Sequence, residues 1–180
     1  IFQTLISILI FKIPYVVHYS TSLYCHLAMF LVALIFTPIQ CLSEELLFRS
    51  LFYTVAKKTK ISAPLTSLIS ALFFTLAHLT NVEILSSTTP MLILSYYFLS
   101  GFFFMEIVFA YKGIEVALGA HIMNNFFITT LVNYTDSSIY SYPFITMGSP
   151  NIFIDLFLLI ISSSILLFLP SRAKRVVEPF

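Results

Sequence analysis

The chain has 180 residues, of which 59% are hydrophobic and only 9% are charged, and its mean hydropathy is +0.98. These values exclude a soluble globular domain and predict an integral membrane protein that sits in a lipid bilayer. The net charge of +1 gives no basic surface, so no nucleic acid partner is expected.

Six apolar segments are interpreted as membrane-spanning helices, and a shorter stretch at residues 1–11 as the end of a truncated helix. Pro38 is expected to break or kink the chain between the first two spans, and Pro170 to end the last one. The sequence therefore predicts an all-α, polytopic helical bundle in a single domain over residues 1–180, with about six full spans plus a partial N-terminal helix. The predicted spans are residues 23–37, the segment from Pro38 to Lys57, and residues 61–79, 91–111, 117–132 and 151–169.

Basic residues predict how these spans are oriented. Lys12, the lysine cluster (Lys57, Lys58 and Lys60), Lys112 and the basic C-terminal tail are expected to be cytoplasmic. Residues 80–90 and 133–150 contain no Lys or Arg and are expected to form loops on the other side. Alternation of six spans agrees with this assignment, so we predict a multi-pass protein of the cell membrane with its basic loops and tail in the cytoplasm.

Three ionisable residues, Glu44, Glu45 and Arg49, lie inside one of the apolar segments. Each charged side chain at the centre of a spanning helix costs about 3 kcal/mol on insertion scales. The presence of three such residues in one segment therefore requires a structural or functional explanation. On a helix Glu45 and Arg49 are four residues apart and share a face, so we expect them to pair. Glu44 is rotated by about 100° from Glu45. We therefore expect Arg49 to hold Glu45 and to leave Glu44 free.

Two further apolar segments carry residue pairs at the same spacing, Phe74 with His78 and His121 with Asn125. Polar groups at membrane depth face the bundle interior or a water-filled cavity. Taken singly, the three groups are explained by a register-fixing ion pair, an interfacial histidine and a hydrogen bond between helices. Together, on three helices, they are expected to line one polar chamber.

The depths of these residues differ when the helices are taken as straight. Measured from the basic boundaries, Glu44, His78 and His121 lie about 20, 27 and 14 Å deep. Tilted or broken helices, with Pro38 and Gly119 as break points, are therefore needed to bring the side chains together.

The available side chains suit the activation of a water molecule. They comprise two carboxylates, two imidazoles, a carboxamide and a guanidinium, without a Ser or Cys nucleophile beside a base. Glu44 is predicted to act as general base on a water that His78 positions. His121 and Asn125 are predicted to donate hydrogen bonds to the oxyanion that forms when water attacks a carbonyl.

A zinc ion is the alternative, with Glu44, His78 and His121 as its ligands. The metalloprotease signature HExxH is absent, and no predicted helix carries two of these histidines, so we predict no cofactor. The cysteines, Cys25 and Cys41, lack the CxxC spacing and are expected to be buried, inert thiols.

The ordered set Glu44-Glu45-x-x-x-Arg49, Phe74-x-x-x-His78 and His121-x-x-x-Asn125 resembles the CPBP family, also called Abi. This family contains CAAX prenyl proteases and bacteriocin-processing enzymes. The sequences around His78 and before His121, His-Leu-Thr-Asn-Val-Glu and Gly-Ala-His, resemble the bacterial branch. The resemblance covers about residues 42–127.

The resemblance implies an intramembrane endopeptidase whose substrate is a membrane-associated or lipid-modified peptide or protein. It places the base at Glu44, an assisting imidazole at His78, and the oxyanion hole at His121 and Asn125. Phe74, Glu45 and Arg49 are then supporting residues.

Two other functions stay open at this point. The first is a non-catalytic bacteriocin-immunity or binding protein on the same scaffold. The second is a proton- or ion-coupled carrier, because buried carboxylates and histidines also build relays, although no inverted hydropathy repeat is apparent.

Overall fold

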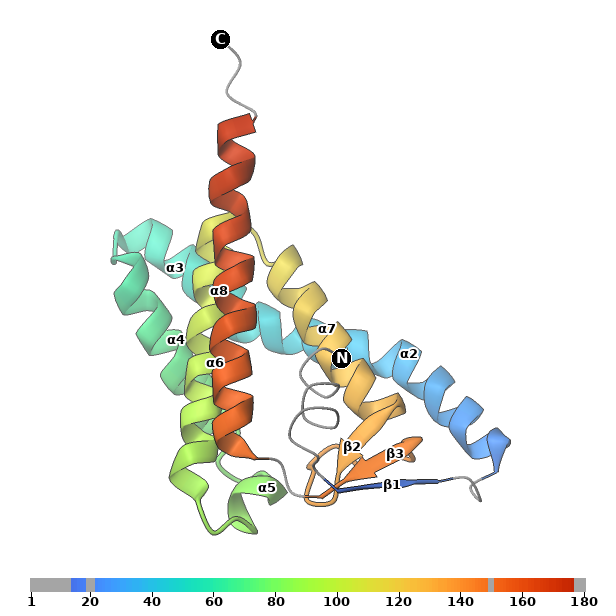
Figure 1. Cartoon of the computed structure of the whole chain (residues 1–180). Helices are drawn as coiled ribbons and strands as arrows, with labels where there is room; N and C mark the ends of the chain where they lie inside the picture. The colour runs from blue at the N-terminus through green and yellow to red at the C-terminus, as the bar shows by residue number, and fades with distance from the viewer. Residues whose placement is uncertain (1–13, 19–21, 149–150, 177–180) are drawn as a thin grey trace.

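The structure is a computed structural model, and it describes residues 14–18, 22–148 and 151–176. The partial helix expected over residues 1–11 lies outside these residues. The described chain is mostly helical, with a small sheet at one end (Figure 1). Its elements are β1 (Tyr15–Val17), α2 (Leu23–Glu45), the π-helix η1 (Leu46–Ser50), α3 (Leu51–Thr59), α4 (Ala63–Ala77), α5 (Val82–Leu85), α6 (Pro90–Tyr111), α7 (Glu115–Thr130), β2 (Val132–Tyr134), β3 (Ile145–Met147) and α8 (Ile152–Val176).

The longest element is one continuous helix over Leu23–Thr59, made of α2, η1 and α3. Pro38 lies inside α2 and does not end it, so the prediction of two separate spans at this point is wrong. A proline removes one backbone hydrogen bond, and a membrane helix tolerates this loss when nearby groups satisfy the freed carbonyl. With 37 residues, the helix is about 55 Å long, against a hydrocarbon core of about 30 Å. It therefore crosses the molecule obliquely, as Figure 1 shows beside α6 and α8.

Three helices among the described residues are long and apolar enough to cross a membrane, namely Leu23–Thr59, Pro90–Tyr111 and Ile152–Leu169. Helix α4 is apolar but has only 15 residues, and α7 has 16. These helices agree with the predicted membrane protein, whereas the count of six full spans is not confirmed. Helix α8 continues past Pro170 to Val176, so the prediction that this proline ends the last helix is wrong.

Close packing joins α4 to α6 and α2 to α7. At Gly101 of α6 an added Cβ would lie 2.9 Å from the Cα of Ala71 in α4, so a side chain at this position would push the two backbones apart. Helix α6 also packs against α8, where the Tyr111 hydroxyl donates a hydrogen bond to the Leu166 carbonyl at 3.0 Å. Buried residues of the core here are Ile107, Val108 and Ala117.

Three short strands form a sheet at one end of the molecule, which the all-α prediction did not include. The strand order is β1-β3-β2, with β1 antiparallel and β2 parallel to β3. Thr146 in β3 is paired with Val16 on one side and Asn133 on the other. Each strand has three residues, which is too short for a period-two pattern to appear in the sequence.

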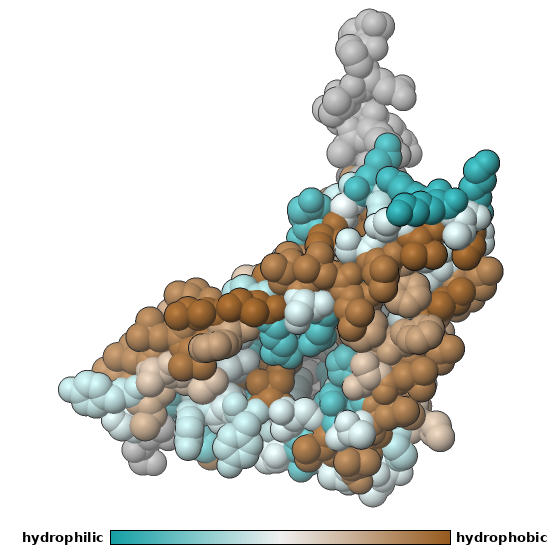
Figure 2. Space-filling model, turned by 180° about the vertical axis from the view of Figure 1, so that it is seen from behind, coloured by the Kyte–Doolittle hydropathy of each residue, from teal (hydrophilic) through white to brown (hydrophobic). Residues whose placement is uncertain are grey.

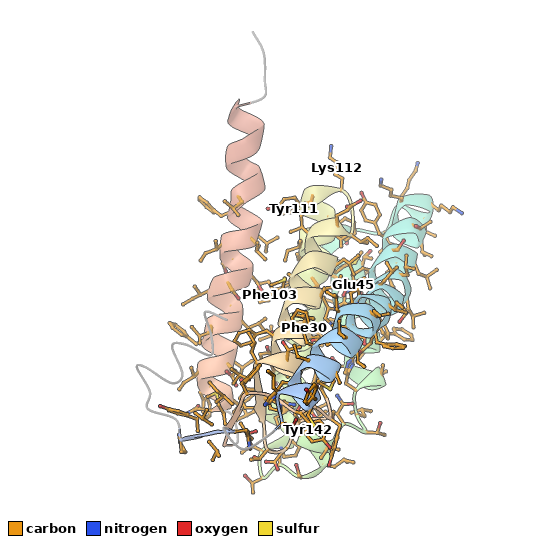
Figure 3. All side chains as sticks on the ribbon, turned by 90° about the vertical axis from the view of Figure 1, so that its right-hand side faces the viewer. Phe30, Glu45, Phe103, Tyr111, Lys112 and Tyr142 are labelled. Atoms are coloured by element: carbon orange, nitrogen blue, oxygen red, sulfur yellow. The ribbon has the colours of Figure 1, made fainter. Side chains whose placement is uncertain are left out.

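The sheet and α5 lie at the opposite end of the molecule from Lys112, which follows α6 (Figures 1 and 3). Because one long helix replaces two predicted spans, β1 lies at this sheet end and away from the lysine cluster. The strict alternation of six spans is therefore not followed by the described residues. Lys12 itself lies outside the described residues. Cys25 is exposed, contrary to prediction, whereas Cys41 is buried as predicted.

Candidate active site

Glu44 and Glu45 are the last residues of α2, and the π-helical turn η1 follows them directly. A π-turn closes its backbone hydrogen bonds over five residues instead of four, and such turns are rare and frequent at functional sites. The buried hydroxyl of Ser70 in α4 donates to the Phe48 carbonyl of this turn at 2.5 Å. The widened turn beside the two carboxylates is thus held by a contact from another helix.

Glu45 lies at the centre of a buried ionic group. Its side chain and that of Arg49 are both fully buried, and Glu45 Oε2 lies 3.4 Å from Arg49 Nε. Its other oxygen, Oε1, accepts a hydrogen bond from His121 Nδ1 of α7 at 2.8 Å. The carboxylate therefore links the long helix to α7, and Figure 3 shows it far from both Lys112 and Tyr142 at the two ends.

The Arg49 guanidinium is surrounded by aromatic rings. Its Cζ lies 4.3 Å from the centroid of the Phe74 ring, 5.4 Å from that of Phe104 and 6.0 Å from that of Phe48. Among the described residues, none of its three nitrogens has a hydrogen-bond partner. The charge is balanced by the Glu45 carboxylate and by the faces of the rings, which attract cations.

Glu44 lies in different surroundings, with its side chain 20% exposed. Its Oε1 accepts a hydrogen bond from Gln40 Nε2, one turn earlier in α2, at 3.1 Å. Its Oε2 lies 3.7 Å from His121 Nε2 and 4.0 Å from His78 Nε2. The structure thus brings Glu44, His78 and His121 together from α2, the end of α4, and α7.

The hydrogen bonds of the two histidines fix which nitrogen carries the proton. His78 Nδ1 lies 2.7 Å from the Phe74 carbonyl, and His121 Nδ1 lies 2.8 Å from the Glu45 carboxylate. Both partners only accept, so each Nδ1 is the donor, and in a neutral imidazole each Nε2 then presents a lone pair. With both imidazoles neutral, two Nε2 atoms and Glu44 Oε2 would thus be three acceptors at separations longer than a hydrogen bond.

Asn125 lies one turn after His121 on α7 and contacts α2 at a neighbouring position. Its Nδ2 donates to Cys41 Sγ at 3.6 Å, and its Oδ1 accepts from Asn124 Nδ2 at 3.2 Å. The amide has two N–H groups, so the contact with Cys41 uses only one of them. Cys41 in turn lies one turn before Glu44.

The tilt of the long helix accounts for the meeting of residues that straight helices would hold at different depths. Neither Pro38 nor Gly119 ends its helix. Instead, α2 crosses α7 obliquely, and α4 ends at Ala77 so that His78 lies at its C-terminus (Figure 1). Figure 2 shows a hydrophilic area in a hollow in the middle of the molecule, with hydrophobic residues on both sides of it. The side chains of Glu44 and His78 are 20% and 18% exposed, which is open enough for a small molecule to reach them.

Three residues near the site were not predicted from the sequence. Gln40 lies four residues before Glu44, and this spacing is the signal that would have found it. Asn124 was not singled out, because the His121-x-x-x-Asn125 pattern includes only its neighbour Asn125. Tyr97 of α6 stacks on His78, and no local pattern links residues so far apart in the chain.

The donor set of Glu44, His78 and His121 has the chemistry of a zinc site, but its spacing is wide. Ligands of tetrahedral zinc with bonds of about 2.0–2.1 Å lie about 3.3 Å from one another. The distances here are 3.7 and 4.0 Å from Glu44 Oε2 to the two Nε2 atoms. In the described part of the chain, no group of three or more His, Cys, Asp and Glu residues has the geometry to hold a metal ion.

Comparison with known families assigns the chain. Residues 4–127 match the family model described as type II CAAX prenyl endopeptidase Rce1-like. No curated protein and no solved structure gave a match. The matched residues include Glu44, Glu45, Arg49, His78, His121 and Asn125, and the family implies a CAAX endopeptidase activity within the membrane. The family match covers more than half of the chain, which therefore belongs to the Rce1-like family of type II CAAX prenyl endopeptidases.

Proposed function

We propose that this chain is an intramembrane endopeptidase that uses Glu44 to activate a water molecule. The proposed substrate is a prenylated protein or peptide, cleaved at a peptide bond near its CAAX-type C-terminus. The observation that supports this proposal is the meeting of Glu44 Oε2 with the Nε2 atoms of His121 and His78, at 3.7 and 4.0 Å. Glu44 Oε2 and His78 Nε2 are two acceptors 4.0 Å apart, so they attract a molecule that brings protons, and water is the simplest one.

Simple geometry supports a shared water. A water oxygen about 2.8 Å from both Glu44 Oε2 and His78 Nε2 would see them at an angle of about 90°. It can donate one proton to each and still direct a lone pair toward a substrate carbonyl. When the water oxygen bonds to the carbonyl carbon, its proton passes to Glu44. As the C–N bond breaks, Glu44 returns that proton to the leaving amine nitrogen.

The oxyanion is proposed to form near His121 and Asn125. To donate from Nε2, His121 must carry protons on both nitrogens, and the Glu45 carboxylate at its Nδ1 stabilises that cation. Asn125 supplies the second N–H of its amide, which Cys41 leaves free. Fixed donors of this kind stabilise the charge that develops in the transition state, because they are oriented before the reaction begins.

Glu45 and Arg49 are proposed to keep this arrangement in place. Both are fully buried, and Arg49 balances the charge of Glu45 while it packs on Phe74, whose carbonyl holds His78. The low dielectric of a membrane interior strengthens each of these electrostatic contacts.

The proposal is tested with purified protein in detergent and a farnesylated CAAX peptide, with the released tripeptide measured by mass spectrometry. Glu44→Gln keeps the shape and removes the base, so kcat is expected to fall by about 100-fold or more, as for loss of a general base. A similar fall in kcat is expected for His78→Ala. Glu115→Gln, an exposed carboxylate at the start of α7, is the control and should keep wild-type kcat.

Two results would contradict the mechanism. Full cleavage by Glu44→Gln would remove Glu44 as the base. Binding of the peptide without cleavage, by wild type and Glu44→Ala alike, would instead indicate the non-catalytic binding protein. Elemental analysis of the purified protein, together with cleavage in strong chelator, tests the metal-free form, and we expect no stoichiometric zinc and unchanged cleavage.

A further inference from the structure

His78 lies where its own helix gives it little support. It is the C-terminal cap of α4, with φ −102° and ψ 1°, and its backbone N–H donates to the Thr75 carbonyl at 3.1 Å. The side chain is 18% exposed. One hydrogen bond, from Nδ1 to the Phe74 carbonyl, holds the ring from within α4. A ring that must direct Nε2 at a shared water therefore needs contacts from other elements.

Tyr97 of α6 provides such a contact. Its ring stacks on His78, with the centroids 4.6 Å apart and an angle of 26° between the planes. The Phe74 ring lies against the same imidazole, with the two centroids 4.3 Å apart and the ring planes tilted by 42°. Two aromatic neighbours thus limit the rotation of the His78 ring, and such pairs favour one geometry over others.

Glu83 fixes Tyr97 in turn. Its Oε1 accepts a short hydrogen bond from the Tyr97 hydroxyl and a second bond from Asn81 Nδ2 at 3.2 Å. Asn81 Nδ2 also donates to the Tyr97 oxygen at 2.8 Å. The three side chains form a closed triangle, so the phenol cannot turn without breaking two bonds.

The second oxygen of Glu83 binds a distant segment of the chain. Oε2 accepts from the Ser138 backbone N–H at 3.0 Å and from the Ser138 hydroxyl in a short bond. The Ser138 hydroxyl also accepts from the Val82 backbone N–H at 2.8 Å. Ser138 belongs to the segment between β2 and β3, so one carboxylate connects the sheet end of the molecule to Tyr97.

We propose that Glu83 is a positioning residue for His78, acting through Tyr97 and anchored by Ser138. The assignment of a catalytic purpose to this chain of contacts rests on the proposed function, whereas the control of the His78 ring does not. Glu83 is not expected to touch the substrate.

The alternative is that Glu83 only fastens the segment between β2 and β3. Both readings agree that its anionic form is the bonded one. Burial acts to raise the pKa of Glu83, but the hydrogen bonds from Ser138 and then Tyr97 outweigh it and lower the pKa below its usual value. The two readings differ in whether His78 responds when the Glu83 contacts are removed.

The test measures His78 directly, by mass spectrometry of its modification with diethyl pyrocarbonate, and measures cleavage separately. Tyr97→Phe keeps the stacked ring but removes the hydroxyl, and Glu83→Gln removes the charge. Tyr97→Leu removes the stacking. The control is Tyr140→Phe, which changes a tyrosine that is 91% exposed in the same segment as Ser138.

We expect His78 to be modified several-fold faster in Glu83→Gln and Tyr97→Leu, with Tyr97→Phe intermediate and Tyr140→Phe unchanged. We expect kcat to fall by about tenfold or more with little change in KM, because misplacement of a catalytic group slows the chemical step. Ser138→Ala should show a weaker form of the same change.

Three outcomes separate the readings. Unchanged His78 modification and unchanged kcat in both Glu83→Gln and Tyr97→Phe would overturn the proposal. A rise in KM alone, with His78 modification unchanged, would also overturn it and leave Glu83 as a fastening residue. Faster His78 modification in a protein whose wild type does not cleave the peptide would support the positioning role while the proposed function fails.

Discussion

Glu44 and Glu45 are adjacent in the chain but lie in different surroundings. Glu45 is fully buried between Arg49 and His121, whereas Glu44 is partly exposed and directs one oxygen at two imidazoles. The rotation of about 100° per residue is enough to predict that Arg49 pairs with one of them only. That His121 shares Glu45 could not be predicted, because it depends on how α7 packs against α2.

At the residue scale, the buried pair gives a prediction about stability. Arg49→Met leaves Glu45 as an uncompensated buried carboxylate, so it is expected to destabilise the protein by about 3–5 kcal/mol. The double variant Glu45→Gln/Arg49→Met removes both charges and should recover most of that loss. Thermal unfolding in detergent, monitored by circular dichroism, measures both.

Cleavage then separates stability from function in the same variants. The double variant leaves His121 Nδ1 with a neutral amide oxygen in place of the carboxylate, so its cleavage should stay low although the fold is restored. Equal destabilisation by the single and double variants would show that the charge pair is not what stabilises this region.

Glu83 gives a prediction about acid stability. Its folded-state pKa is lowered below the ordinary value of about 4.3. Its contribution to stability is therefore complete above that ordinary value and is lost as the pH falls through the folded-state pKa. Between pH 6 and 3, the unfolding temperature of wild type should fall more steeply than that of Glu83→Gln. Parallel curves for the two proteins would contradict this linkage.

At the scale of elements, hydropathy located the helices but did not show where one helix ends and the next begins. The apolar segments predicted at residues 91–111 and 151–169 correspond to α6 and α8, because uninterrupted apolar runs of this length have few alternatives in a bilayer. Pro38 led to the wrong prediction of a break between two spans, because the bundle tolerates a proline inside a long helix. The π-turn η1 has no known sequence signature here, and its contact with Ser70 joins residues far apart in the chain.

The contact of α4 with α6 gives a prediction with a matched control. A Cβ at Gly101 would lie 2.9 Å from the Ala71 backbone and 3.3 Å from Phe74, whereas one at Gly119 would meet nothing within 4 Å. Gly101→Ala is therefore expected to displace α4, and with it Phe74 and His78, and to lower both the unfolding temperature and kcat. Gly119→Ala should leave the unfolding temperature unchanged or slightly higher, because alanine favours a helix by about 1 kcal/mol.

Two measurements decide whether the close packing of α4 against α6 sets the geometry of the site. Unfolding temperature and kcat are compared for both alanine variants against wild type. If Gly101→Ala behaves like Gly119→Ala, the backbone approach of α4 and α6 does not set the geometry of the site.

At the scale of the whole molecule, charge and architecture together indicate an orientation. The lysine cluster at the end of α3 and Lys112 after α6 lie at one end, and the sheet, with α5, lies at the other (Figures 1 and 3). The described segment between β2 and β3 has no Lys or Arg. Because short basic loops tend to stay in the cytoplasm, we predict that the sheet end lies on the outer side.

Cysteine labelling of intact cells tests this orientation. In a Cys25→Ser background the remaining thiol, Cys41, is buried, and new thiols are introduced at Tyr140, Lys58 and Lys112 in separate variants. An impermeant maleimide is expected to label Tyr140→Cys in intact cells, because this side chain is 91% exposed at the sheet end. Lys58→Cys and Lys112→Cys should be labelled only after the cells are permeabilised. The reverse pattern would place the basic end outside, and labelling of Tyr140→Cys and Lys112→Cys from one side would contradict the arrangement of the helices themselves.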